Sequence, residues 1–115
     1  MNYHFDTQYM RLYHNPRCSK SRQALALLLQ RDLEFDDYRY LEHGIAEEDF
    51  ELLLGMTGIV RQQEIDKSVQ FDPNNKSQLR KLLQDNPKAL QRPILIKDGR
   101  AVIGRPPENI LDLLD

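Results

Sequence analysis

The sequence predicts a single α/β domain with a small mixed β-sheet flanked by helices. Three observations support this class. A strand, a helix and a second strand follow one another near the N-terminus, the middle is helical, and an Asp-Gly pair joins two apolar runs near the C-terminus. A chain of 115 residues is most simply one domain. Hydrophobic residues make up 40% of it, which is enough for a modest core.

The N-terminal elements form a βαβ unit. Residues 10–13 (MRLY) predict a short strand. Residues 19–31 predict a helix, because Leu25, Leu28 and Leu29 recur at i, i+3 and i+4 on one face. Residues 33–40 (LEFDDYRY) predict a second strand, since aromatic side chains favour a pleated surface. The crossover should be right-handed and the two strands parallel.

The middle of the chain predicts two helices. Residues 46–54 form the first, with an acidic first turn that suits the helix dipole. Residues 59–76 predict no regular element beyond a turn at DPNN. Residues 77–84 form the second helix, with Ser77 as the N-cap and an end before Pro87.

The C-terminal part predicts a hairpin and a last helix. In PILIKDGRAVI, the pair Asp98-Gly99 between apolar runs indicates a two-residue hairpin turn. Residues 107–114 predict a helix with proline in its first turn and with Ile110, Leu111 and Leu114 facing inward. The whole order is the thioredoxin-like plan. We expect one domain over residues 10–115, with a helical insertion at about 44–86.

Composition excludes several classes of protein. The 16 basic and 18 acidic residues give no basic excess, so we expect no nucleic-acid partner. No apolar run is long enough to span a membrane and no cleavable signal is visible, so we expect a cytoplasmic protein. Residues 1–9 are polar and predict an N-terminal extension, with disorder as an open alternative. One cysteine and three scattered histidines predict no metal site.

Cys18 is the candidate nucleophile. It follows a proline-containing loop in YHNPRCSKSR and stands where the predicted helix begins. Unpaired N–H groups in a first helical turn stabilise a thiolate and lower its pKa. The alternative is a buried structural cysteine, which the polar loop disfavours.

Two neighbours of Cys18 are candidate supporting residues. Ser21 could donate a hydroxyl hydrogen bond to the sulfur across one turn, and His14 could orient the loop. The spacing is Cys-x-x-Ser, so Ser21 cannot resolve a mixed disulfide. Any thiol that restores Cys18 must therefore come from another molecule.

Two arginines are candidate anion-binding residues. Arg92 precedes Pro93 at the entry of the hairpin, and Arg105 precedes two prolines before the last helix. A residue before proline is held extended, and guanidinium groups bind oxyanions bidentately. Exposed surface arginines on turns are the alternative.

These segments together resemble the ArsC family, the glutaredoxin-dependent arsenate reductases and their relatives. YHNPRCSKSR resembles the active-site segment of the family, and QRPILI and GRPPE resemble its two Arg-Pro motifs, over about residues 10–115. The resemblance implies a thioredoxin-like fold with a helical insertion. It also implies Cys18 as nucleophile, Arg92 and Arg105 as oxyanion ligands, and a cis bond between Arg92 and Pro93.

The resemblance further implies the supporting and reacting partners. His14, Asn15 and Ser21 would support Cys18, and a third arginine in the insertion is best matched by Arg61 in VRQQE. Another alignment places Asp66 there. The implied activity is reduction of arsenate to arsenite, with glutathione as co-substrate, glutaredoxin as partner and no bound cofactor. The alternatives are a thiol-dependent reductase or glutathione-binding protein with another substrate, and a regulator like Spx that binds RNA polymerase.

Overall fold

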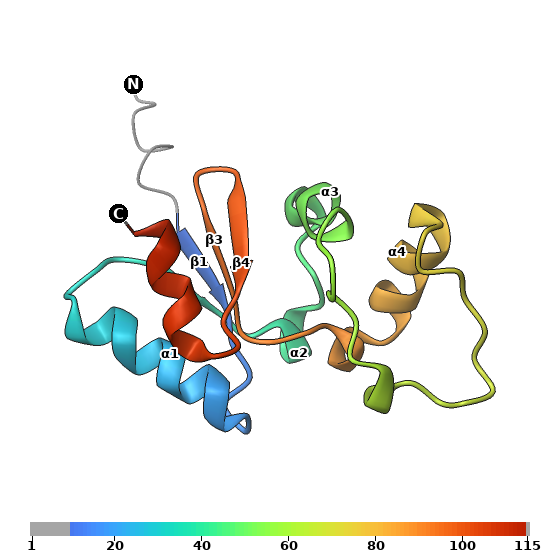
Figure 1. Ribbon diagram of the computed structural model, residues 1–115, viewed down its shortest axis with the longest axis horizontal. Coiled ribbons are helices and arrows are strands. Elements are labelled where there is room, and N and C mark those ends of the chain that lie inside the picture. Colours follow the sequence, from blue (N-terminus) through green and yellow to red (C-terminus); the bar gives the residue numbers. More distant parts are fainter. Residues whose placement is uncertain (1–9, 115) are drawn as a thin grey trace. The chain divides into compact units, whose positions relative to one another are not determined.

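The computed structural model describes residues 10–114, which form two compact units (Figure 1). The first unit combines the chain up to Arg39 with the chain from Arg92 onward, and it contains the four-stranded sheet. The second unit is Tyr40–Gln91. The extension predicted for residues 1–9 lies outside the described residues. Within residues 10–114, every helix is too short or too polar to cross a membrane.

The sheet of the first unit is mixed, which confirms the predicted α/β class. Its strand order is β2-β1-β3-β4. The central strand β1 (Met10–Tyr13) is parallel to β2 (Asp36–Tyr38), as the βαβ prediction requires. On its other side β1 is antiparallel to β3 (Ile94–Lys97), which in turn pairs antiparallel with β4 (Arg100–Ile103).

The strand β2 is shorter than the predicted residues 33–40. It has three residues, and Tyr40 already begins the helix α2 (Tyr40–His43). Leu33 and Phe35 come before the strand and pack against the core without pairing to β1. The aromatic residues of this segment favour a strand, but Phe35 and Tyr40 pack their rings from positions outside β2.

The strand register brings three chain segments to one end of the sheet. Tyr13, the last residue of β1, pairs with Ile94, the first residue of β3. Ile94 also pairs with Ile103, the last residue of β4. The segments containing Cys18, Arg92 and Arg105 therefore all adjoin the row formed by these three residues, at one end of the sheet.

One face of the sheet is covered by the helix α1 (Ser19–Gln30) and the C-terminal 3-10 helix η5 (Pro107–Leu113) (Figure 1). The predicted helix at residues 19–31 is confirmed, with Arg31 as its C-cap, but Leu29 is exposed, and the buried face is formed by Ser21, Ala24 and Leu28. Burial of apolar surface between these layers stabilises the unit. The buried core consists of Met10, Leu12, Ala24, Leu28, Leu95, Ile110 and Leu113.

The predicted hairpin turn is confirmed. Asp98 has φ 51° and Gly99 has φ 81°, and both lie between the paired ends of β3 and β4. Two consecutive positive φ angles are the requirement of a type I′ turn, which aspartate and glycine tolerate.

The last helix differs from its prediction in type and in buried side chains. η5 is a 3-10 helix, and it buries Ile110 as predicted. Leu111 and Leu114 are only half-buried, whereas Leu113 is buried. The three-residue period of a 3-10 helix places Leu113 on the same face as Ile110.

The second unit is built from short helices. The predicted helix at residues 46–54 is divided, because a 3-10 turn precedes five α-helical residues. The elements of this unit after α2 are η2 (Glu47–Asp49), α3 (Phe50–Leu54), η3 (Gln62–Glu64), α4 (Lys76–Asp85) and η4 (Pro87–Ala89).

The helix α4 begins earlier than predicted, and Ser77 is not its N-cap. Asn75 caps it, since its side-chain oxygen accepts the N–H of Gln78 at 3.1 Å. Asparagine and serine are both favoured at this position, so composition alone did not decide between them. The helix ends at Asp85, before Pro87, as predicted.

Candidate active site

Cys18 is the N-cap residue of α1, at the end of a tightly bonded loop. Its backbone is extended, with φ −97° and ψ 122°, and its carbonyl accepts the N–H of Arg22 at 3.0 Å. The Cys18 N–H donates to the Asn15 carbonyl at 3.0 Å, and the Asn15 side chain accepts the Arg17 N–H at 3.0 Å. Asn15 thus fixes the loop from both its backbone and its side chain.

The surroundings of Cys18 favour its thiolate. Burial, the largest influence, raises the pKa of the thiol, but the Ser21 N–H, the Arg92 side chain, the Lys20 N–H and the Arg105 side chain together lower it below its ordinary value. The backbone N–H groups of Ser21 and Lys20 act on the sulfur through hydrogen bonding, although Cys18 makes no side-chain cap hydrogen bond of regular geometry. The half-buried Cys18 therefore remains accessible while its charged form is stabilised.

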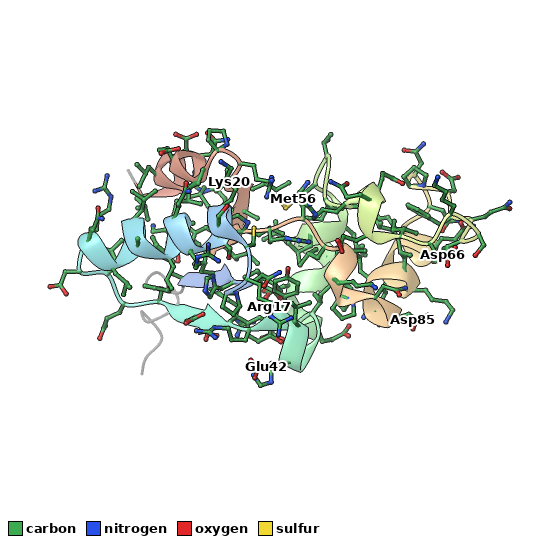
Figure 2. All side chains as sticks on the ribbon, turned by 90° about the horizontal axis from the view of Figure 1, so that it is seen from below. Arg17, Lys20, Glu42, Met56, Asp66 and Asp85 are labelled. Carbon is green, nitrogen blue, oxygen red and sulfur yellow. The ribbon has the colours of Figure 1, made fainter. Side chains whose placement is uncertain are left out.

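Basic side chains also flank Cys18 in sequence. Figure 2 labels Arg17 in the loop and Lys20 in the first turn of α1. Arg17 is exposed and Lys20 is half-buried, and the first turn of α1 contains no acidic residue. The local charge at this end of the helix is therefore positive, although the whole chain has a formal charge of −2.

The predicted hydrogen bond from the Ser21 hydroxyl to the sulfur is wrong. Ser21 is fully buried, and its Oγ lies 2.6 Å from His14 Nδ1. The same Oγ accepts the N–H of Asn15 at 2.9 Å. The hydroxyl is directed into the unit because the loop's own polar groups need it there, and only the backbone N–H of Ser21 acts on the sulfur.

His14 is buried beside Ser21, and its surroundings disfavour the charged imidazolium form. Burial lowers the pKa of His14, opposed by Asp37 and reinforced by Arg39 and Arg22. Asp37 is itself held by two hydrogen bonds of 2.9 Å from Arg39, and this contact lowers the pKa of its carboxyl group. A neutral imidazole can accept a hydrogen bond from the Ser21 hydroxyl at Nδ1. His14 therefore supports the Cys18 loop from its buried side.

The two Arg-Pro segments meet at Cys18. Arg105 Nη1 lies 4.0 Å from Cys18 Sγ and donates to the Arg92 carbonyl at 3.0 Å. The Arg92 side chain also acts on the sulfur. The Arg92-Pro93 bond is cis, as the resemblance implied, and the Arg105-Pro106 bond is cis as well. A thiolate and two guanidinium groups are therefore gathered in one place, an arrangement suited to a tetrahedral oxyanion.

Two residues near these arginines were missed by sequence reasoning. Gly104 donates its N–H to the Pro93 carbonyl at 2.8 Å, and Asn109 Nδ2 donates to the Arg105 carbonyl at 3.3 Å. The glycine that opens GRPPE was a usable signal, since glycine often marks a close approach of two segments. No sequence signal indicated Asn109.

Arg61 belongs to the second unit. Its N–H donates to the Ala89 carbonyl at 2.8 Å, and its Nη1 donates to Gln91 Oε1 at 3.2 Å. Asp66, the other alignment of the third position, turns its carboxylate back onto Ser68, and hydrogen bonds from this residue lower the pKa of Asp66. The alignment that places Asp66 at the third position would leave the third arginine missing, and the role of Arg61 as that arginine stays a prediction.

The part of the chain that the structure describes contains no group of three His, Cys, Asp or Glu side chains that could hold a metal ion. The groups gathered at this site are the Cys18 thiol, backbone N–H groups and guanidinium groups. Guanidinium groups have no lone pair for a metal, so this donor set fits an anion.

Known proteins resemble this chain over nearly its whole length. An uncharacterized protein of Escherichia coli, YfgD, is 38% identical over 94% of this chain and 98% of its own. A protein named arsenate reductase in Haemophilus influenzae is 37% identical over 90% and 97%. The solved structure titled arsenate reductase from Vibrio cholerae is 31% identical, covers 90% of this chain and 96% of its own, and superposes with a TM-score of 0.75.

A more distant relative is a transcriptional regulator. The global transcriptional regulator Spx of Listeria innocua is 29% identical over 81% of this chain and 77% of its own.

The model of the ArsC family matches residues 13–113, which include Cys18 and both Arg-Pro segments. The structural neighbour from Vibrio cholerae shows that the predicted thioredoxin-like fold is correct. The chain therefore belongs to the ArsC family.

Proposed function

We propose that this protein reduces arsenate to arsenite with Cys18 as nucleophile, and that glutathione and glutaredoxin supply the electrons. The observation that supports this most directly is the contact of 4.0 Å between Arg105 Nη1 and Cys18 Sγ. It puts a fixed positive charge beside a sulfur whose pKa is already lowered. Relatives named arsenate reductase point to the same substrate.

The first step forms the adduct. The Cys18 thiolate donates an electron pair to arsenic, a sulfur–arsenic bond forms, and a hydroxyl group of arsenate takes up a proton and leaves as water. Arsenic stays at the +5 level. Arg92 and Arg105 neutralise the oxyanion throughout, and Arg61 is expected to join them.

Reduction occurs in the second step. A glutathione thiolate attacks the Cys18 sulfur, a disulfide forms, and the electron pair of the sulfur–arsenic bond stays on arsenic. Arsenic is thereby reduced to the +3 level and leaves as arsenite. A glutaredoxin thiolate then attacks the glutathione sulfur of this mixed disulfide and releases Cys18 as thiolate, while a further thiol restores glutaredoxin.

An external thiol is required because the chain contains one cysteine. The third residue after Cys18 is Ser21, whose buried hydroxyl is bonded to His14 and Asn15. A reaction of this kind needs a compartment rich in reduced thiols, which fits the expected cytoplasmic location.

The test is arsenite formation by the full chain with glutathione, with and without glutaredoxin, and with thioredoxin in a parallel reaction. We expect turnover that requires glutathione, is accelerated by glutaredoxin and is absent in Cys18→Ser. Ser19→Ala is the matched control, because Ser19 is the exposed neighbour on the same helical turn. No arsenite above the Cys18→Ser background would overturn the substrate, whereas dependence on thioredoxin would overturn only the proposed electron donor.

A different substrate is the first alternative within the same chemistry. If Cys18 exchanges with glutathionylated peptides but forms no arsenite, the protein is a thiol-dependent reductase that binds glutathione. Inorganic phosphate, a tetrahedral anion of similar shape, would then still slow alkylation of Cys18 by occupying the arginine pair.

A regulator like Spx is the second alternative, favoured only by the more distant similarity to Spx of Listeria innocua. The residue three positions after Cys18 is serine, so the chain lacks a second thiol for an internal redox switch. A stoichiometric complex with purified RNA polymerase, together with no arsenite formation, would support the regulator.

A further inference from the structure

Gly104 occupies a place that no larger residue fits. It follows β4 and directly precedes Arg105, and it is buried. A Cβ atom at this position would lie 2.9 Å from Pro93 Cγ and 3.0 Å from Ile110 Cγ2. Pro93 is a closed ring and both neighbours are fully buried, so an added methyl group would force a neighbour or the backbone to shift. Close packing of this kind transmits a small change in volume into displacement of the backbone.

The displaced backbone would be the one that holds the two arginines. The Gly104 N–H donates to the Pro93 carbonyl at 2.8 Å, and Arg105 Nη1 donates to the Arg92 carbonyl at 3.0 Å. Two hydrogen bonds thus join consecutive residues of one segment to consecutive residues of the other. The two Arg-Pro segments therefore move together, and the packing at Gly104 sets their separation.

Asn109 holds the same segment from the helix side. Its Nδ2 donates to the Arg105 carbonyl at 3.3 Å, and its backbone N–H donates to the Pro106 carbonyl at 3.0 Å. These bonds tie the residues on both sides of the Arg105-Pro106 junction to η5. Because η5 packs on the core through Ile110, the position of Arg105 is fixed relative to the sheet.

We propose that Gly104 and Asn109 are positioning residues for the anion site, which hold Arg105 and, through it, Arg92 beside the Cys18 sulfur. Gly104 does so by allowing the close approach of Pro93, and Asn109 by holding the Arg105 carbonyl. The inference deepens the proposed function. Its predictions for arsenate kinetics rest on that function, whereas its predictions for the alkylation of Cys18 do not.

Gly104→Ala tests the first residue, with Gly55→Ala as the matched control. A Cβ at Gly55 would meet nothing closer than Leu52 O at 3.6 Å, and the φ of Gly55 is −87°, so alanine fits there. The rate of alkylation of Cys18 by iodoacetamide is measured against pH. We expect the midpoint to rise by roughly half a pH unit in Gly104→Ala, because the guanidinium groups move away from the sulfur. Gly55→Ala should match the wild type.

Arsenate kinetics supply the second readout. We expect KM for arsenate to rise by about tenfold in Gly104→Ala, with a smaller change in kcat, since misplaced ligands weaken binding of the anion. A thermal melt accompanies each variant. A folded Gly104→Ala that melts earlier but keeps the wild-type alkylation midpoint and KM would reduce Gly104 to a purely structural residue and overturn its positioning role.

Asn109→Ala keeps the inference testable if Gly104→Ala does not fold. The substitution removes one hydrogen bond from a half-buried side chain and introduces no clash. We expect a smaller rise of the alkylation midpoint in the same direction, and an unchanged midpoint would overturn the role of Asn109. If the wild-type protein forms no arsenite, the alkylation profiles still decide the positioning roles, so the two failures are distinguishable.

Discussion

The hydroxyl oxygen of Ser21 lies 2.6 Å from Nδ1 of His14, inside the first unit and away from the reactive sulfur. Ser21 also accepts the N–H of Asn15, the residue whose carbonyl holds the Cys18 N–H. His14, Ser21 and Asn15 therefore form a buried polar chain that ends at the backbone of Cys18. The order of the nucleophilic loop depends on this chain.

Ser21→Ala should destabilise the protein by about 1–3 kcal/mol, because it leaves a buried imidazole nitrogen and a buried backbone N–H without their partner. The free energy of unfolding in urea measures this. Ser19→Ala, at an exposed position of the same helix, should change it by less than about 0.5 kcal/mol. Equal effects of the two substitutions would contradict the structural role of the Ser21 hydroxyl.

His14 should make stability depend on pH in the mildly acidic range. Burial lowers the pKa of His14 in the folded protein, so the unfolded chain binds the proton more readily. The contribution of His14 to the free energy of unfolding is full above the ordinary histidine pKa of about 6.5. It is lost as the pH falls through that value toward the lowered pKa of the folded protein. The slope from this one proton cannot exceed roughly 1.4 kcal/mol per pH unit.

His14→Asn tests this dependence, since asparagine retains a polar atom near Nδ1 but does not titrate. We expect lower stability at pH 7 and a smaller loss of stability between about pH 6.5 and pH 5 than in the wild type. The variant His43→Asn, at an exposed position, is measured in parallel. An unchanged slope in His14→Asn would assign the acid sensitivity to other groups.

Arg105→Ala should move the pKa of Cys18 toward that of an ordinary thiol. The guanidinium group is one of the influences that lower the pKa of Cys18, so its loss raises that pKa and reduces the thiolate fraction at pH 7. Alkylation at neutral pH should slow by several-fold, with a midpoint shifted upward. Arg105→Lys should recover only part of the rate, because lysine keeps the positive charge but does not reproduce the planar guanidinium fork that Arg105 presents.

Arg100→Ala is the matched control for this prediction. Arg100 is an exposed residue at the start of β4, and its removal changes the net charge by the same amount. Its alkylation profile should follow the wild type. A similar slowing in Arg100→Ala would mean that the total charge of the chain, and not the contact at 4.0 Å, controls the sulfur.

The neighbouring leucines Leu28 and Leu29 should respond very differently to truncation. Leu28 is 0% exposed in the core, whereas Leu29 is 62% exposed on the same helix. Leu28→Ala should cost about 2–5 kcal/mol of stability, since it removes buried apolar surface and leaves a cavity. Leu29→Ala should cost less than about 0.5 kcal/mol. Urea unfolding of the pair measures the difference directly.

Elements with a local cause could be predicted from the sequence. Asp98-Gly99 specifies its hairpin because few residues accept two positive φ angles. The helix α1 follows from the spacing of its leucines. The gathering of the three segments was implied by the resemblance to the ArsC family, and the strand register brings them to one end of the sheet.

Features that depend on competing partners could not be predicted. The Ser21 hydroxyl could have faced the Cys18 sulfur one turn before it, and the sequence does not show that its oxygen instead contacts His14 Nδ1 and accepts the Asn15 N–H. Asn75 and Ser77 are both good N-caps, and only the path of the preceding loop decided between them. The importance of Gly104 is visible only once Pro93 and Ile110 are placed around it.

The sheet register separates the reactive end of the first unit from its opposite end. Tyr13, Ile94 and Ile103 form the row next to the anion site, whereas the Asp98-Gly99 turn joins β3 and β4 at the other end of the strands. A fluorophore or a peptide epitope placed at this turn would be remote from the sulfur within the same unit. The turn is therefore a natural attachment point for reporters that follow binding of the electron donor without obstructing it.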